Sequence, residues 1–364
     1  MSSLEDARKT INDVDAKMAE LFCARMRAAE VVAAYKKEHG IKVRDAVREG
    51  EIIQQNSQLV EDKTLREYYV KFLESCMSLS RAYQDRLMSG MKVAYCGTEG
   101  AFAHIATVKL FSTAQKIAYP DFASAYAAVV GGECDAAVLP VENSYNGEVG
   151  QVTDLMFSGS LYVNSMLELA VSQALLTVPG ATLSDIKEVI SHPQALEQCA
   201  DYLKGKDYIR HEYANTALAA QKVAEMGDRS VAAIASAEAA EMFGLCVLEK
   251  NINASKNNTT RFAVFSRSEN AYSADEKDMH TVLVFTVRNE AGALAKAIDI
   301  IGKHGLNMIS LKSRPMKELL WQYYFYVEVE GNINAGKGKE MLRELKCYCD
   351  RVKTVGTFKK DTEA

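Results

Sequence analysis

The stretch Asn257-Asn258-Thr259-Thr260-Arg261-Phe262 leads directly into the apolar run of residues 263–265. The apolar run predicts a buried strand, and the polar residues before it lie where that strand begins. Two hydroxyls and a guanidinium at such a place are groups that can hold and protonate a small dianion. A polar turn at a strand end is as often only structural, so the functional interpretation depends on the polar loops elsewhere in the chain.

Around this stretch the sequence alternates between strand and helix patterns. Short apolar runs at residues 92–95 and 136–141 are separated by helical stretches such as residues 217–225, which predicts an α/β fold. Polar loops follow the apolar runs, because Glu142-Asn143-Ser144 comes after one run and Ser191-His192-Pro193 after another. The second loop precedes a helix whose amides can receive a carboxylate, so two lobes with an anion-binding cleft are expected.

Four separate polar motifs follow one another along residues 91–267. They are Gly97-Thr98-Glu99-Gly100-Ala101-Phe102, then Pro140-Val141-Glu142-Asn143-Ser144 with Gly147, then Ser191-His192-Pro193-Gln194-Ala195 with Gln198-Cys199, and finally residues 257–262. Together they resemble the ordered motifs of prephenate dehydratase. That enzyme removes carboxylate and hydroxide from prephenate and so forms the aromatic ring of phenylpyruvate.

The resemblance implies a role for each matched residue. Thr260 is the expected donor to the leaving hydroxyl, and its neighbours must assist because a threonine hydroxyl is a poor acid. The polar site around the substrate would contain Asn143, Ser144, Ser191 and Gln198, with Glu142 organising it. Arg261 either anchors a carboxylate or forms a structural ion pair. Ser191 has the alternative of capping the helix, and His192 that of a turn or packing residue.

The first of these motifs departs from the family pattern at two positions. Thr98 stands in place of the usual proline, and Ala103 in place of the usual serine or threonine. A hydroxyl lost at Ala103 is expected to weaken contact with the substrate. The run 97–102 lacks the spacing of a dinucleotide-binding loop, so no cofactor is expected.

Residues 1–90 have a different character. They contain no proline, and Ile11, Val14, Met18 and Leu21 recur at helical spacing, so an all-α domain is expected. Taken singly, the polar residues of these helices are most simply explained as a solvated face. As a set they resemble those of the all-helical chorismate mutases: Arg8, Arg25, Lys36, Asp45, Arg48, Glu49, Ser80 and Gln84.

That second resemblance implies a site without a covalent catalyst, because chorismate rearranges to prephenate within one molecule. Arg8 and Arg25 would hold its two carboxylates, since a guanidinium binds a carboxylate bidentately. Negative charge grows on the breaking ether oxygen, which Lys36 and Gln84 would face. Glu49 would form a hydrogen bond to the substrate hydroxyl, and Asp45, Arg48 and Ser80 would complete the polar wall of the site.

The spacing of the basic residues adds an expectation about assembly. Arg8 and Arg25 are 17 residues apart, which on one helix is about 25 Å, too far for one small dicarboxylate. Arg25 and Lys36 are 11 residues apart, or about 16 Å, so two long side chains can close on one ligand. Arg8 must then come from a second subunit or from a sharply bent helix. An intertwined homodimer with composite sites is therefore expected, as the resemblance also implies.

A polar stretch at residues 268–278 separates a last unit, residues 279–358. Its pattern predicts strand, helix, strand, strand, helix, strand, with strands at 281–287, 307–311 and 322–329, which is compatible with a ferredoxin-like unit. Gly292-Ala293-Leu294 and Ser313-Arg314-Pro315 resemble the two phenylalanine-binding stretches of the ACT regulatory domain. Lys312 replaces the glutamate that ordinarily begins the second stretch and reverses its charge. The alternative is a purely structural module.

Composition excludes several other classes of protein. The 364 residues are 48% hydrophobic and 25% charged with a net charge of -5, which gives no basic surface for nucleic acid. The first residues lack the pattern of a signal peptide, and no apolar run is long enough to span a membrane, so a cytoplasmic location is expected. Eight cysteines without paired CxxC spacing argue against a metal site and against a disulfide framework.

The sequence thus predicts three domains: an all-α mutase domain at residues 1–90, a two-lobed α/β dehydratase domain at 91–268 and an α+β ACT domain at 279–358. We expect a bifunctional enzyme that converts chorismate to prephenate and prephenate to phenylpyruvate, with phenylalanine as effector. One alternative is a mutase whose dehydratase site is impaired. The other is a non-catalytic amino-acid sensor.

Overall fold

The computed structural model describes residues 3–254, 257–273, 277–316, 319 and 321–360. The chain divides into two compact units, Met1–Lys92 and Val93–Ala364. Within the described residues, no helix is both long and apolar enough to cross a membrane.

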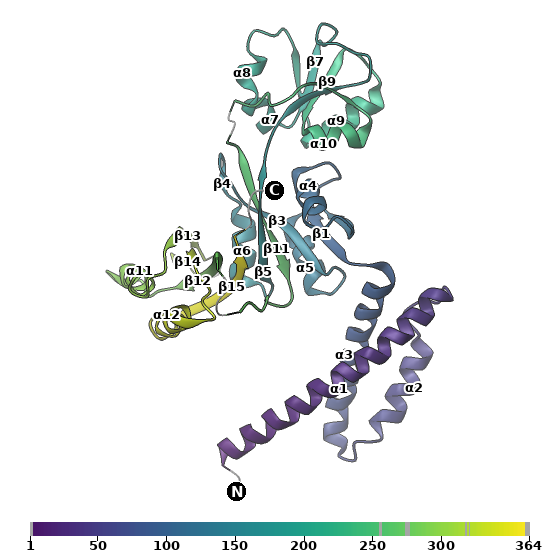
Figure 1. Cartoon of the computed structure of the whole chain (residues 1–364), viewed down its shortest axis with the longest axis vertical. Coiled ribbons are helices and arrows are strands. Elements are labelled where there is room, and N and C mark those ends of the chain that lie inside the picture. The colour runs from purple at the N-terminus through teal and green to yellow at the C-terminus, as the bar shows by residue number, and fades with distance from the viewer. Residues whose placement is uncertain (1–2, 255–256, 274–276, 317–318, 320, 361–364) are drawn as a thin grey trace. The chain divides into compact units, whose positions relative to one another are not determined.

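The first unit is helical, as the sequence predicts (Figure 1). It contains α1 (Leu4–Glu38), α2 (Ala46–Ser57) and α3 (Lys63–Ser89). Ser3 and Asp6 form a capping box that begins α1, and Asp45 and Asp62 accept backbone hydrogen bonds at the starts of α2 and α3. The helix α1 runs without a break from Arg8 past Arg25 to Lys36, and Figure 1 shows no sharp bend in it, so the bent-helix alternative for Arg8 is wrong.

The second unit begins with a lobe built on one mixed sheet, in the strand order β2-β1-β3-β11-β5 with β4 paired to β3. These strands are β1 (Lys92–Cys96), β2 (Gln115–Tyr119), β3 (Ala136–Asn143), β4 (Gly147–Glu148), β5 (Tyr162–Ala170) and β11 (Thr259–Ser266). The helices of this first lobe are α4 (Phe102–Leu110), α5 (Phe122–Val130) and α6 (Gly150–Ser158). The stretch 257–262 therefore leads into β11, which lies between β3 and β5.

A second lobe is built on the sheet β10-β6-β9-β7-β8. Its strands are β6 (Ala174–Thr177), β7 (Glu188–Ser191), β8 (Ile209–Glu212), β9 (Val231–Ala235) and β10 (Cys246–Glu249), and its helices are α7 (Pro193–Gln198), α8 (Ala200–Leu203), α9 (Thr216–Met226) and α10 (Ala237–Phe243). The chain enters this lobe through residues 171–173 and is back in the first lobe at β11. The predicted two-lobed α/β arrangement is thus present.

The last part of the second unit, called here the C-terminal sheet, has the predicted order of strands and helices. It contains β12 (Met279–Thr286), α11 (Ala293–Lys303), β13 (Met308–Pro315), β14 (Tyr323–Glu330), α12 (Gly336–Tyr348) and β15 (Arg351–Lys359), in the sheet order β13-β14-β12-β15. The strand predicted at residues 307–311 is longer in the structure, because the stretch 312–315 forms its end and pairing with β14 continues to Pro315 and Tyr323.

The C-terminal sheet packs closely on the first lobe. A Cβ atom at Gly356 of β15 would overlap the backbone carbonyl of Val163 in β5, so only glycine permits this approach. Residues of both sheets also share one core, in which Phe265 and Val163 of the first lobe lie with Val282 and Val355 of the C-terminal sheet. Contacts between these two sheets therefore bear directly on β11 and its neighbours.

Candidate active sites

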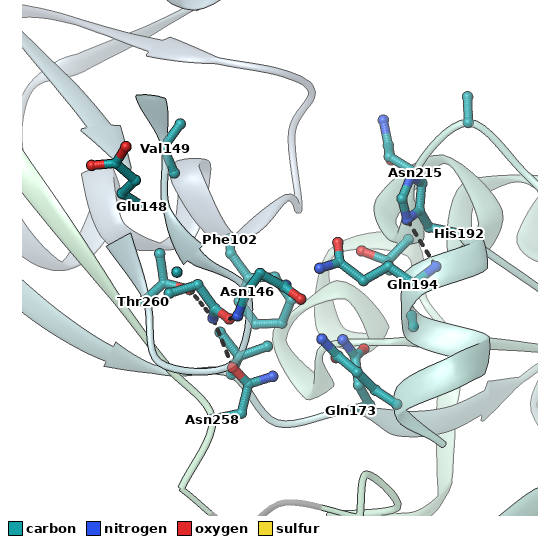
Figure 2. A pocket seen from close by; sticks show the side chains of 17 residues that line it. Phe102, Asn146, Glu148, Val149, Gln173, His192, Gln194, Asn215, Asn258 and Thr260 are labelled. Carbon is teal, nitrogen blue, oxygen red and sulfur yellow. Dashed lines mark hydrogen bonds between the residues drawn. The ribbon is translucent and has the colours of Figure 1, made fainter. Parts of the chain in front are cut away.

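A cavity of about 420 Å³ in the second unit is lined by residues of both lobes (Figure 2). The first lobe contributes Asn143, the turn of residues 146–149 and Thr260. From the second lobe come Gln194, Gln198 and Asn215. The predicted site residues Thr260, Asn143 and Gln198 are therefore brought together at one cavity.

A hydrogen bond between neighbouring strands fixes the centre of this site. Thr260 of β11 is in register with Asn143 of β3, and Asn143 Nδ2 donates to Thr260 Oγ1 at 2.9 Å and to Asn258 Oδ1 at 2.7 Å. Asn143 Oδ1 in turn accepts the backbone N–H groups of Tyr145 and Asn146, both at 3.0 Å. Since Thr260 Oγ1 accepts from Asn143, its own hydrogen is free to be donated to a ligand.

Two of the predicted site residues, Ser191 and Ser144, donate hydrogen bonds from their hydroxyls to backbone carbonyls of the protein. Ser191 is completely buried and donates to Ile234 O at 2.6 Å. The helix cap at this place is His192, whose Nδ1 accepts from Gln194 N at 3.3 Å, so the idea that Ser191 caps α7 is wrong. Ser144 Oγ donates to Asn257 O at 2.8 Å and accepts from the backbone N–H of Thr259 at 3.0 Å. Both serines brace loops of the site and are not among the described residues that line the cavity.

Two predicted charged residues lie on the other face of their strands. Glu142 Oε1 pairs with Lys312 Nζ of the C-terminal sheet at 2.8 Å. Arg261 donates from both terminal nitrogens to the carboxylate of Glu328, at 2.8 and 2.9 Å. Of the two roles expected for Arg261, the structure contains the ion pair. Neither residue is among the described residues of the cavity wall.

Sequence reasoning missed the amide side chains that surround the centre, which Figure 2 shows facing the cavity from both lobes. Gln173 is only 2% exposed, and its Oε1 has no hydrogen-bond partner among the described residues. Asn258, Gln194 and Asn215 also line the wall. Asn258 and Gln194 lie within motifs quoted above, whereas Gln173 lies in the short crossing between the lobes and carries no local signal.

The described wall of the cavity contains no lysine or arginine. Glu148 is its one carboxylate, and Oε1 of that residue is paired with Arg314 at 2.6 Å. An anion in this cavity would therefore be held by amides, hydroxyls and the imidazole of His192. Neutral donors of this kind can stabilise charge when they are fixed in place before the ligand arrives.

The two departures in the first motif have different surroundings. Thr98 Oγ1 accepts a hydrogen bond of 3.3 Å from Asn215 Nδ2, so this threonine joins the first lobe to a residue of the cavity wall in the second. Ala103 is buried in α4 and is not among the described lining residues. Phe102 is the residue of this region that lines the cavity.

In the helical unit, several predicted mutase residues lie on facing helices. Arg25 Nη1 donates to Cys76 O at 3.1 Å and to Ser80 Oγ. Gln84, one turn further along α3, is buried, and its Oε1 has no hydrogen-bond partner among the described residues. Lys36 Nζ donates to Val43 O at 2.5 Å. Arg25, Ser80 and Gln84 thus form a polar set between α1 and α3.

The residues of α2 have more varied positions. Glu49 is paired with Arg81 at 2.5 Å, a partner that sequence reasoning missed. Asp45 caps α2 by accepting from Arg48 N at 3.0 Å, while the exposed side chain of Arg48 pairs with Glu51 at 3.1 Å. Arg8 is exposed on α1, about 25 Å along the helix from Arg25 by the helical rise.

The two stretches assigned to an effector lie at the start of α11 and the end of β13. Gly292 has φ of +82° and precedes Ala293, the first residue of α11, which is buried, with Leu294 partly buried. Arg314 donates to Asp154 Oδ1 at 2.9 Å and to Glu148 Oε1 at 2.6 Å, so its guanidinium is directed at the first lobe. Ser313 and Pro315 are exposed.

Comparison with known proteins places both sites in a family context. Residues 7–85 match the family model of chorismate mutase type II, and residues 93–270 match that of prephenate dehydratase. The chain is 30% identical over 361 residues to a bifunctional chorismate mutase/prephenate dehydratase of Neisseria gonorrhoeae, covering 96% of this chain and 95% of that protein.

Two solved structures resemble a large part of this chain. GqqA, described as a novel type of quorum quenching acylase, has a TM-score of 0.69 and 30% identity, over 74% of this chain and 98% of that one. Prephenate dehydratase from Arthrobacter aurescens in complex with L-Phe has a TM-score of 0.68 and 26% identity, over 74% of this chain and 90% of that one.

Proposed function

The chain belongs to the family of bifunctional chorismate mutase/prephenate dehydratases, and we propose that its helical unit converts chorismate to prephenate while its second unit converts prephenate to phenylpyruvate. The observation that carries the dehydratase activity is the pairing of Thr260 with Asn143 in a cavity lined by residues of both lobes. The set Arg25, Ser80 and Gln84 between α1 and α3 supports the mutase activity.

The dehydratase reaction breaks two bonds of prephenate at once. The ring carboxylate leaves as carbon dioxide, and its electron pair moves into the ring as the C–O bond to the hydroxyl breaks, so the ring becomes aromatic. The departing hydroxide needs a proton and leaves as water. Thr260 Oγ1 donates its hydrogen bond to that oxygen, and Asn143 Nδ2 holds Oγ1 so that its hydrogen is directed into the cavity.

The substrate side chain and the ring carboxylate then contact the amides of the wall. Gln198 and Asn215 of the second lobe face Asn143 and Thr260 of the first. Gln173 Oε1 accepts a hydrogen bond from the ring hydroxyl, which is the one donor of the ionised substrate, because a buried amide oxygen without a partner is costly. Binding of the substrate in this way would draw the two lobes together around it.

In the mutase site, catalysis consists of holding the compact conformer of chorismate and stabilising the charge on the ether oxygen. Arg25 is fixed by Ser80 and the carbonyl of Cys76, which directs its remaining donors to a carboxylate. Lys36 and Gln84 supply donors to the ether oxygen. For Gln84 this requires its amide nitrogen to face the substrate.

The mutase site is completed by a second copy of the chain, whose Arg8 holds the other carboxylate. The apolar residues Leu4, Ile11 and Met18 of α1 are seven residues apart, and each is at least 43% exposed. This spacing is that of a helix that pairs with another helix, so a second α1 would bury the row. The next position of the same row is Arg25, where the paired helices would meet the substrate.

Phenylalanine is the proposed effector of the C-terminal sheet. A structure of a related prephenate dehydratase is a complex with L-Phe, and Gly292 to Leu294 and Ser313 to Pro315 are the residues that we assign to this ligand. Binding of phenylalanine would affect the dehydratase cavity through Arg314. This residue donates hydrogen bonds to Glu148, which lines the cavity, and to Asp154 of α6.

The experiment that tests this function is one assay of the purified chain with chorismate, in which chorismate, prephenate and phenylpyruvate are quantified over time, with and without phenylalanine. We expect chorismate to disappear and phenylpyruvate to form, with phenylalanine suppressing the second step. Prephenate that accumulates without phenylpyruvate would contradict the dehydratase assignment. Arogenate, assayed beside prephenate, would show whether the amino analogue is also a substrate.

A further inference from the structure

A row of charged residues lies on the side of the first lobe that faces the C-terminal sheet. Arg261 of β11 is in register with Glu142 of β3 and with Glu168 of β5, so these three side chains are neighbours across three strands. Side chains alternate between the two faces of a sheet. Asn143 and Thr260, each one residue along, therefore lie on the opposite face, where they line the dehydratase cavity.

The C-terminal sheet supplies a partner for two members of this row. Lys312 of β13 binds Glu142 at 2.8 Å, and Glu328 of β14 binds Arg261 through both carboxylate oxygens. Glu328 is fully buried and also bonds His280 Nδ1 of β12 at 2.9 Å. Burial alone would raise the pKa of Glu328, but the hydrogen bonds from Arg261 and His280 outweigh it and hold that pKa below its ordinary value.

Each ion pair holds one strand of the catalytic hydrogen bond. The Asn143 to Thr260 bond joins β3 to β11, Lys312 holds β3 through Glu142, and Glu328 holds β11 through Arg261. Lys312 and Glu328 lie on adjacent strands of one sheet, in which Glu328 pairs with Ser310 and Lys312 with Tyr326. The C-terminal sheet therefore holds both β3 and β11, on the face opposite the side chains of Asn143 and Thr260.

We propose that Lys312 is a positioning residue of the dehydratase: its ion pair with Glu142 keeps Asn143 at hydrogen-bond distance from Thr260. This inference rests on the proposed dehydratase function. Lys312 and Glu142 are 19% and 29% exposed, so their attraction is only partly screened by solvent. The positive charge of Lys312 thus raises the dehydratase kcat, and it does so by binding the carboxylate of Glu142.

Charge exchange between the two residues tests this inference. The variants Lys312→Glu and Glu142→Lys each place like charges in contact, and the double variant restores an opposite pair in the reversed orientation. We expect each single variant to lower dehydratase kcat about tenfold or more, because small displacements of a catalytic group are costly. The double variant is expected to recover most of that loss, and Lys312→Arg, which keeps the charge, to lie close to wild type.

Two controls separate positioning from general damage. Mutase turnover, measured in the same samples, is expected to be unchanged in every variant, because its residues lie in the helical unit. Lys303→Glu makes the same charge change on α11, where Lys303 is exposed and pairs with Asp299, and it should leave dehydratase kcat unchanged. Melting temperatures of all variants establish that the compared proteins are folded.

The inference is overturned if Lys312→Glu keeps the wild-type dehydratase kcat, or if the double variant is no better than the single ones. It is also overturned if the single variants raise KM and leave kcat unchanged, which would make Lys312 part of substrate binding. The wild-type chain is assayed with prephenate first. An inactive wild-type chain would count against the proposed function, whereas an active Lys312→Glu variant counts only against the positioning role.

Discussion

The helical unit and the second unit bury their apolar residues to very different extents. Along the whole of α1 the buried residues are Ala29 and Ala33, and Leu21 is 71% exposed. In β9, by contrast, every residue from Val231 to Ala235 is buried. A long helix with an exposed apolar row needs a partner, whereas the second unit forms its core and its cavity from one chain. The contrast predicts a mutase site shared between chains and a dehydratase site contained within one.

The two sites also differ in how they would hold an anion. The predicted mutase residues of the helical unit include the cations Arg25 and Lys36, while the described wall of the dehydratase cavity has amides and hydroxyls and no lysine or arginine. Cations suit the two carboxylates of a substrate that only has to be folded upon itself. Fixed neutral donors suit a reaction in which a carboxylate must lose its charge as carbon dioxide.

The largest expected effect separates the two sites within one polypeptide. Thr260→Ala removes the donor to the leaving hydroxyl and should lower dehydratase kcat by about 10²–10⁴-fold, the range of a lost acid catalyst. Mutase kcat should stay within about twofold of wild type, since no shared group is involved. Both rates are measured on one preparation. Thr260→Ser keeps the hydroxyl and serves as the control, and an active alanine variant would contradict the assignment of Thr260.

A charge on the exposed row of α1 should damage only the mutase. Met18→Asp places a carboxylate where a second α1 would pack, so we expect at least about a tenfold loss of mutase activity. Light scattering should also give a smaller mass for the variant protein than for the wild type. Ala16→Asp makes the same kind of change at an exposed position outside the row and should be neutral. Full mutase activity in Met18→Asp would show that the helical site does not depend on a partner.

Loss of the buried charge pair behind β11 should lower stability in the second unit alone. Glu328→Gln leaves Arg261 with only the half-exposed Glu168, at 3.5 Å, as a counter-charge. Loss of one partner of a buried pair typically costs about 3–5 kcal/mol, which would lower Tm by roughly 10 °C. Glu330→Gln, a matched change at an exposed position of the same strand, is the control. Calorimetry of both variants measures the difference. Equal melting temperatures would mean that the pair contributes no stability.

The smallest expected effect concerns pH. Burial, with a smaller contribution from Arg351, lowers the pKa of Lys353 from 10.5 to about 8. Between these two values the unfolded chain binds more protons at this residue than the folded chain, so the free energy of unfolding rises with pH across that window. Lys353→Met lacks this contribution.

The wild-type Tm should therefore increase relative to that of Lys353→Met as the pH rises from about 8 to about 10, and the difference should be flat below pH 8. Parallel melting curves of the two proteins at a series of pH values measure it. A difference in Tm that falls over the same window would contradict the lowered pKa of Lys353.

The helical character of residues 1–90, the order of elements in residues 279–358 and the centre of the dehydratase cavity could be predicted because each has local signals. Apolar runs indicate several of the strands, although not β8, whose four residues are all exposed. Thr260 and Asn143 follow from motifs at strand ends that the fold brings into register. The partners of Glu142 and Arg261 had no such signal, since Lys312 and Glu328 come from a different sheet far along the chain. Ser191 was expected to be near the substrate, but its position at the end of a buried strand directs its hydroxyl to Ile234.

Complementation between inactive variants tests most directly the claim that the mutase site is shared and the dehydratase site is not. Arg8→Ala and Lys36→Ala chains, mixed and allowed to exchange subunits, can form dimers in which one of the two mutase sites is intact. Random pairing then predicts recovery of about one quarter of wild-type mutase activity. A mixture of Thr260→Ala with Asn143→Ala chains should recover no dehydratase activity. Absence of mutase recovery, or recovery of the dehydratase, would contradict the account.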